Sequence, residues 1–279
     1  LGLLNKKFDV SLLNDIQNKW VPYNFESENI DDFLENLNID KTVEISSIRG
    51  GYSNALKQLN KFIEVGYQDY AQYRSDPSKE ASSQLSPYFH SGQISTHEVF
   101  DKISELESWS PESINPKMVG RREGWWGSSD NFESFMDELI TWRELGYHTC
   151  VRRANYNQYS SLPEWAIKTL HEHSSDEREY IYSLDELTYS QTHDEIWNAA
   201  QNQLRTQGVI QNYLRMLWGK KILEWTPNPQ IALSYMITLN DRYSLDGRDP
   251  NSYSGVFWIL GRYDLSLIHI SEPTRLSLI

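Results

Sequence analysis

The sequence contains a single cysteine, Cys150, among 279 residues. One thiol excludes an intramolecular disulfide and a thiolate metal cluster, and it is typical of a reducing compartment. Long apolar runs are also missing: no stretch of about twenty apolar residues is present, and no charged start leads into the apolar core of a secretion signal. We therefore expect a soluble, cytoplasmic protein that does not associate with a membrane.

Positive charge is scarce, because 26 Lys and Arg stand against 39 Asp and Glu, for a formal net charge of −13. Such a chain repels a polyanion at long range, which excludes generic coating of nucleic acid. Any binding to DNA must therefore be local and depend on shape. No sequence feature indicates an obligate protein partner.

Alternating strand patterns of useful length are absent, and helical periodicity begins at about Arg49. In GGYSNALKQLNKFIEVGYQDY, apolar residues recur at spacings of three and four. Further amphipathic windows lie at about 96–107, 131–148, 163–173, 193–207, 210–225 and 229–243. The pattern predicts an all-α domain over residues 48–264, preceded over residues 1–47 by an acidic linker remnant that bears short helices.

The stretch SSQLSPYFHSGQIS contains a helix-start signal, in which Ser86 is the expected cap and Pro87 the first helical residue. A helix start offers free backbone N–H groups and the positive end of the dipole, so Ser82, Ser83 and Ser86 could hold a phosphate. Taken alone, the motif is explained better by plain capping.

Two aromatic patterns are open to a functional and a structural interpretation. Glu138 and Trp142, in DELITWREL, are four residues apart and share a helix face. They could offer a nucleobase a hydrogen-bond acceptor and a flat aromatic surface for stacking. Trp218 and Trp225 also share a face, with Trp197 on the preceding helix, and such a stripe could relay electrons. By spacing alone, a buried aromatic core explains both patterns better.

The remaining polar motifs have ordinary explanations. Asn240 lies at a helix end before the run DGRDPN, which turn chemistry accounts for without a ligand, and Asp246 and Arg248 could be a surface pair. The HEH triplet at His171 to His173 does not predict zinc, since residues two apart on a helix do not converge and companion ligands are not evident. No metal site is predicted.

In their order along the chain, these motifs carry a specific resemblance. SSQLSPYFHSGQIS, DELITWREL, THDEIWNAAQNQL, NYLRMLWGKKILEW and LNDRYSLDGRDPN together resemble the FAD-binding domain of the DNA photolyase and cryptochrome family, over about Gly50 to Asp264. The last three are most similar to class II cyclobutane-pyrimidine-dimer photolyases. The resemblance implies a helical FAD-binding domain that repairs such dimers by light-driven electron transfer from reduced FAD, with UV-damaged DNA and its flipped dimer as partner.

The resemblance also implies roles for individual residues. Asn240 would lie near the flavin N5, and Arg215 with Asp246 would form an ion pair against the isoalloxazine ring. The flavin and its phosphate portion would be held by Tyr70, Ser82, Ser83, Leu85, Ser86, Asn212, Arg215 and Asp246. The dimer would enter a pocket of Glu138, Trp142, Met216 and Trp258, flanked by the two tryptophans, and Trp218, Trp197 and Trp225 would photoreduce the flavin.

Other family activities stay open at this point. A cryptochrome-type photoreceptor would share the flavin site and the tryptophan chain without needing the dimer pocket, and repair of (6-4) photoproducts is a further alternative. Ile210 and Gln211 stand where family members commonly have Met-His, beside the flavin and lesion region. The hydrogen bonding there is therefore expected to differ.

Both ends of the chain carry expectations of their own. The α/β domain that precedes this domain in the family, and often holds an antenna pigment, is missing, so no antenna chromophore is expected. From Leu265 to Arg275 the sequence LSLIHISEPTR is what a transposon-type sequencing adapter encodes. Residues 265–279 are therefore expected to be a non-native tail.

Overall fold

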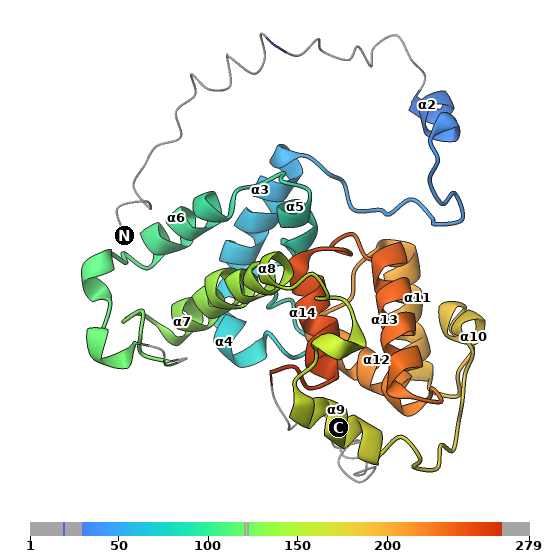
Figure 1. Ribbon diagram of the computed structural model, residues 1–279. Helices are drawn as coiled ribbons and strands as arrows, with labels where there is room; N and C mark the ends of the chain where they lie inside the picture. Colours follow the sequence, from blue (N-terminus) through green and yellow to red (C-terminus); the bar gives the residue numbers. More distant parts are fainter. Residues whose placement is uncertain (1–18, 20–29, 120, 122, 264–279) are drawn as a thin grey trace. The chain divides into compact units, whose positions relative to one another are not determined.

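The computed structural model describes residues 19, 30–119, 121 and 123–263 (Figure 1). These residues form helices and no strand, which confirms the predicted all-α class. The expected tail at 265–279 lies outside the described residues. The helical segments are α2 (Ile30–Asn36), α3 (Tyr52–Lys61), η2 (Phe62–Gly66), η3 (Tyr67–Asp69), α4 (Tyr70–Tyr73), α5 (Ser86–His90), α6 (Thr96–Leu106), η4 (Pro111–Ser113), η5 (Pro116–Met118), α7 (Asp130–Met136), η6 (Asp137–Trp142), α8 (Arg143–Arg152), η7 (Tyr159–Ser161), α9 (Glu164–Glu172), α10 (Leu184–Thr188), α11 (Glu195–Gln207), α12 (Asn212–Glu224), α13 (Pro229–Tyr243) and α14 (Pro250–Ile259).

The chain divides into two compact units, Leu1–Val43 and Glu44–Ile279. In the first unit, α2 is a short acidic helix. The second unit contains α3 to α14 and every residue for which a function is predicted. The domain roles expected on the two sides of residue 47 stay predictions. Within the described part of the chain, no helix combines the length and the apolarity that a bilayer crossing requires.

Polar side chains determine where several helices begin. Ser129, Asp194, Asn228 and Asp249 each accept a hydrogen bond from a backbone N–H in the first turn of α7, α11, α13 and α14. At α5 the prediction is wrong by one residue: Leu85 is the N-cap, and Ser86 is the first helical residue. Ser86 therefore does not cap α5, and its hydroxyl is available to another partner.

The first half of the second unit packs around aromatic rings. Phe62, Tyr67, Tyr70 and Phe135 contact one another with ring centroids 5.1 to 6.4 Å apart. Most of these contacts are edge to face, which is the arrangement that the ring quadrupoles favour, and each adds about 0.5–1.5 kcal/mol to the burial energy. The apolar stripe of α3 faces this cluster through buried Ala55 and Leu59, as its periodicity predicts.

The second half consists of α8 and α11 to α14, and Figure 1 shows α8 running beside α14. Gly146 allows this close approach, because a Cβ atom there would lie 2.6 Å from Asn251 Oδ1 and 3.1 Å from the backbone of Pro250. We expect Gly146→Val to lower the free energy of unfolding by about 1–3 kcal/mol through overpacking. Urea unfolding measures this, with Ala199→Val on the exposed face of α11 as the control. A loss no larger than that of the control would contradict the close approach.

Candidate functional site

An ion pair on the inner side of α12 is the centre of the site. Arg215 Nη1 and Nη2 each lie 3.1 Å from Asp246 Oδ1, and the two side chains are only 14% and 15% exposed. The guanidinium also donates to Asn240 Oδ1 at 3.2 Å and to Ser244 Oγ at 3.4 Å. Because Asp246 follows α13 and Arg215 lies on α12, the pair ties the loop after α13 to its neighbouring helix.

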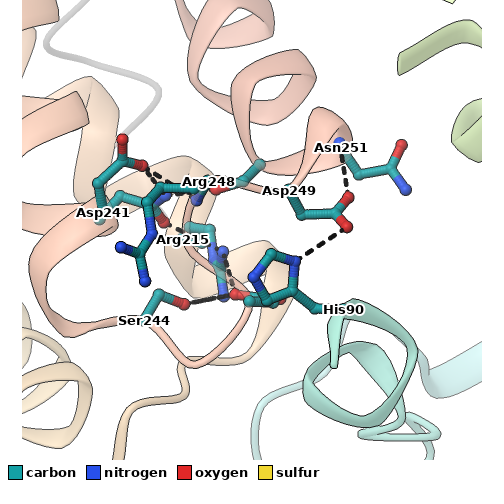
Figure 2. Close-up of polar contacts among 10 residues, drawn as sticks. His90, Arg215, Asp241, Ser244, Arg248, Asp249 and Asn251 are labelled. Atoms are coloured by element: carbon teal, nitrogen blue, oxygen red, sulfur yellow. Dashed lines mark hydrogen bonds and ion pairs between the residues drawn. The ribbon is translucent and has the colours of Figure 1, made fainter. Parts of the chain in front are cut away.

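The Asp246 carboxylate is held in its ionised form. Burial raises its pKa, but the charge of Arg215 and hydrogen bonds from Ser244, Ser86 and Arg215 outweigh burial, so the pKa lies below its ordinary value. Figure 2 shows Arg215 and Ser244 converging on this point. Ser86, at the start of α5, thus reaches the same centre as Arg215, as the shared flavin assignment requires.

A second polar layer surrounds the ion pair. Asn240 is 2% exposed, and its Nδ2 donates to Ser252 Oγ. Asp241 accepts from the Arg248 backbone N–H at 3.2 Å and from the Tyr253 hydroxyl at 2.9 Å, as Figure 2 shows for Arg248. The suggested surface pair of Asp246 and Arg248 is wrong, since Asp246 binds Arg215. These bonds hold Asn240 in one orientation, with its oxygen toward the guanidinium.

His90, the last residue of α5, adds a link to α14. Its Nδ1 lies 3.3 Å from Asp249 Oδ2, while Asp249 Oδ1 caps α14 by accepting from the Asn251 backbone N–H at 2.9 Å (Figure 2). The α5 segment is thereby tied at both ends, through Ser86 to Asp246 and through His90 to Asp249.

Glu138 forms an ion pair with Arg74, which the sequence did not predict. The two side chains are 35% and 27% exposed, and the Arg74 guanidinium lies 5.8 Å from the ring centroid of buried Tyr70. Burial lowers the pKa of Arg74, but the negative charge of Glu138 and the neighbouring Tyr70 raise it more, so the net pKa is raised. Tyr70 thus lies beside Glu138, in the aromatic cluster with Phe62 and Phe135.

Gln211, one of the two residues that depart from the family pattern, has a definite structural role. Its Oε1 accepts from the Leu214 backbone N–H at 3.0 Å and so caps α12. Its Nε2 donates to the Arg74 backbone carbonyl at 2.7 Å. Gln211 therefore joins the start of α12 to the segment that carries Arg74. These two hydrogen bonds are the ones that glutamine makes at this position.

Trp142 and Trp258 lie against each other, with ring centroids 4.4 Å apart and planes inclined by 34°. Rings this close are in contact, so they form one aromatic surface, and a base could enter between them only if they separated. Trp142 Nε1 donates to Asp137 Oδ2 at 3.0 Å, whereas the buried Trp258 Nε1 has no hydrogen-bond partner among the described residues. Because Trp258 Nε1 has almost no exposed surface, a ligand atom could reach this donor only if the surrounding side chains moved apart.

Three buried tryptophans form a chain of ring contacts, in the order Trp218, Trp197 and Trp225. Trp218 and Trp197 are parallel with centroids 6.5 Å apart, and Trp197 and Trp225 are 5.6 Å apart. Trp225 in turn lies 5.6 Å from Tyr182 and 5.1 Å from His193. Since Trp218 is one helical turn from Arg215, the rings form a path from the ion pair outward.

For the remaining residues predicted to bind the flavin or the dimer, the structure shows no direct contact with the Arg215–Asp246 ion pair among the contacts described. Asn212 is exposed at the first position of α12, and Leu85, the N-cap of α5, is fully buried. The backbone carbonyl of Ser83 accepts a hydrogen bond from Gln58 Nε2 at 3.0 Å. Ser82 is half-buried. Met216 on α12 lies near α14, where its Cε would be 3.5 Å from a Cβ at Gly255.

Sequence reasoning missed Arg74, Ser244 and Asp241. Arg74 pairs with a residue 64 positions away, a distance at which no spacing rule applies. Ser244 and Asp241 lie within the motif LNDRYSLDGRDPN, so proximity to Asn240 and Asp246 could have indicated them.

The sequence of this chain is similar to those of several known proteins. No family model matches the chain. It is 40% identical to a deoxyribodipyrimidine photo-lyase of Methanothermobacter thermautotrophicus over 84% of this chain and 47% of that protein. It is 37% identical to one from Potorous tridactylus over 82% of this chain and 40% of that protein. The chain thus spans less than half the length of these curated relatives.

Solved structures share the fold at lower identity. A class III photolyase from Agrobacterium tumefaciens matches with a TM-score of 0.58 and 19% identity, over 85% of this chain and 44% of that one. A Synechocystis cryptochrome matches with a TM-score of 0.56 and 15% identity, over 82% of this chain and 42% of that one. At these identities the likeness concerns the fold.

Proposed function

The chain belongs to the photolyase/cryptochrome family, and from this premise we propose that it is the FAD-binding part of an enzyme that repairs cyclobutane pyrimidine dimers in DNA with light. The observation that carries the proposal is the contact pair Trp142 and Trp258 with the orphaned Trp258 Nε1. This surface suits a flat, extruded base and has no evident use in flavin binding alone.

The residues around Arg215 fit FAD. The buried Arg215–Asp246 pair presents a fixed positive and a fixed negative group, and oriented Asn240 adds amide atoms beside them. A flavin ring has both acceptors and donors along one edge, which such a set can satisfy. Ser86 and the SSQLS segment would hold the phosphate portion. When bound, the cofactor would supply light-driven electron donation to the dimer.

The chain's own residues would position the lesion. Trp142 and Trp258 would stack on the bases and exclude water, and Trp258 Nε1 would donate to a base carbonyl once the two rings had separated. Glu138 would accept from the bases' N–H groups, with Arg74 holding the carboxylate in place. Met216 would pack against the dimer from α12. Together these contacts favour an unstacked dimer over paired bases.

The test is light-driven repair by the 279-residue chain supplied with FAD. The flavin is reduced, and loss of the thymine dimer from an oligonucleotide is followed under blue light and in the dark. We expect repair in light alone. Because stacking contributes about 1–3 kcal/mol per base, Trp258→Ala should slow repair by about tenfold or more. Trp165→Ala, on the more exposed face of α9, is the matched control.

Two results would contradict the proposal. Equal dimer loss in light and darkness would exclude a photolyase. Bound FAD that becomes reduced in light without repairing dimers would move the assignment to (6-4) photoproduct repair or to signalling. The cytoplasmic location and the absence of an antenna chromophore stay predictions.

A further inference from the structure

A pair of opposite charges lies beside the last tryptophan of the predicted electron path. Lys221 Nζ lies 5.4 Å from the ring centroid of Trp225 and 3.0 Å from Glu224 Oε2. All three residues lie at the end of α12, where the Trp225 backbone N–H donates to the Lys221 carbonyl at 2.9 Å. The side chains of Lys221 and Glu224 are 23% and 40% exposed, whereas Trp225 is buried. Water therefore screens the two charges only in part from the ring.

The two inner tryptophans have different surroundings. Among the residues that the structure describes, no lysine or arginine lies over the ring of Trp218 or of Trp197. Both have an acceptor for the indole N–H, which is Gln201 Oε1 for Trp218 and a backbone carbonyl for Trp197. An indole that has lost an electron is positively charged, so an acceptor at its N–H stabilises it. The inner rings have this stabilisation, while the charge of Lys221 bears most strongly on Trp225.

The charge of Lys221 opposes the loss of an electron from Trp225. A cation over a neutral indole is attracted to the negative face of the ring. Once the ring has lost an electron, the same cation repels it, because two like charges are then close together in surroundings less polar than water. The carboxylate of Glu224 offsets this repulsion, since it lies next to the ammonium group.

We propose that Lys221 and Glu224 together set how readily Trp225 is oxidised, and that they thereby regulate the last tryptophan step of flavin photoreduction. Both residues act through Trp225. The proposal rests on the proposed function, in which the chain binds FAD as the electron acceptor in light.

The electrons and protons of this step balance with a thiol as the external donor. One electron leaves Trp218 for the acceptor, and the vacancy moves through Trp197 to Trp225. The thiol then gives one electron to Trp225 and one proton to water. Two of the resulting thiyl radicals combine to form a disulfide.

The experiment follows the return of the electron after a laser flash, in the full chain with oxidised FAD and without thiol. The electron returns by way of the inner rings, so this recombination slows when the vacancy is more stable on Trp225. We expect Lys221→Met to slow recombination about fivefold, since methionine keeps an apolar stem and removes the charge. Glu224→Gln should speed recombination about fivefold, since Lys221 then has no counter-charge.

The opposite signs separate an effect of charge from an effect of packing. Loss of the ion pair alone would move both variants in the same direction. Lys221→Arg keeps the charge and should recombine at the rate of the unmodified chain. The matched controls are Lys168→Met and Glu172→Gln, which break an exposed ion pair on α9 and should leave the rate unchanged.

Two results would overturn the proposal. If Lys221→Met and Glu224→Gln both recombine at the rate of their α9 controls, the pair does not influence Trp225. If both variants change the rate in the same direction, the pair serves packing at the end of α12 and does not tune the ring.

The same material separates this proposal from the proposed function. If Trp225→Phe speeds recombination but Lys221→Met and Glu224→Gln match their controls, the path stands and only the role of the pair is wrong. If chemically reduced enzyme repairs no dimers while the two variants shift recombination as expected, the repair function fails and the role of the pair stands. If the flash takes no electron from a tryptophan, the path fails, and the role of the pair fails with it.

Discussion

Asp246→Ala is expected to lower the free energy of unfolding by about 3–5 kcal/mol, because it leaves the Arg215 guanidinium buried without its counter-charge. The two side chains are 14% and 15% exposed, so water can compensate little of this loss. Asn240 Oδ1 and Ser244 Oγ stay as neutral acceptors and cannot replace a carboxylate. Urea unfolding followed by circular dichroism measures the change.

The same variant is expected to lose FAD, and a double replacement separates the two effects. Arg215→Leu with Asp246→Leu removes both charges, so its stability should recover most of the loss, as replacement of buried pairs by apolar residues often does. After gel filtration, neither the single nor the double variant should retain FAD. Asp101→Ala, exposed on α6, is the control for loss of a carboxylate. Stability loss no larger than in this control, or FAD retained by the double variant, would contradict the assigned role.

The pH dependence of stability follows from the lowered pKa of Asp246. Because the folded protein holds this carboxylate ionised more strongly than the unfolded chain does, its contribution is fully present above the unfolded pKa of about 3.9. The contribution is lost as the pH falls through the lower pKa of the folded state. The unmodified chain should therefore lose more stability on acidification than Asp246→Asn, which has no carboxylate to protonate at this position.

Local periodicity predicted the helices well, since the information lies within each segment. The window at 229–243 coincides with α13, where Pro229 and the cap Asn228 mark the start and apolar spacing continues to Tyr243. The window at 131–148 became three pieces, α7, the π-helical η6 and α8. Apolar spacing does not distinguish α from π geometry within six residues, so this division could not be predicted.

Pairings between distant segments were beyond local reasoning. The short spacing between Asp246 and Arg248 is compatible with a surface pair, whereas Asp246 binds Arg215, which is 31 residues away on another helix. The link came from resemblance to a family and not from spacing. Arg74 had neither a motif nor a family role, so its pairing with Glu138 emerged only from the fold.

Trp225→Phe is expected to slow photoreduction of bound, oxidised flavin at least about tenfold, which corresponds to about 1.4 kcal/mol in the barrier. Trp225 contacts Trp197 on one side and Tyr182 and His193 on the other, so it connects the buried rings to the outer part of the path. A phenyl ring is much harder to oxidise than an indole, and the path would be interrupted there. Blue-light illumination with an external thiol, followed by flavin absorbance, measures the rate.

Trp225 is a sharper target than its neighbours because its Nε1 has no hydrogen-bond partner among the described residues. Trp218 Nε1 donates to buried Gln201 Oε1 at 2.8 Å and Trp197 Nε1 to the Trp218 carbonyl at 3.0 Å, so replacing either also removes a buried hydrogen bond. Trp165→Phe is the control for loss of an indole. Repair by chemically reduced enzyme should be unchanged in both variants, since it bypasses the path. If Trp225→Phe photoreduces as fast as Trp165→Phe, electrons reach the flavin by another route.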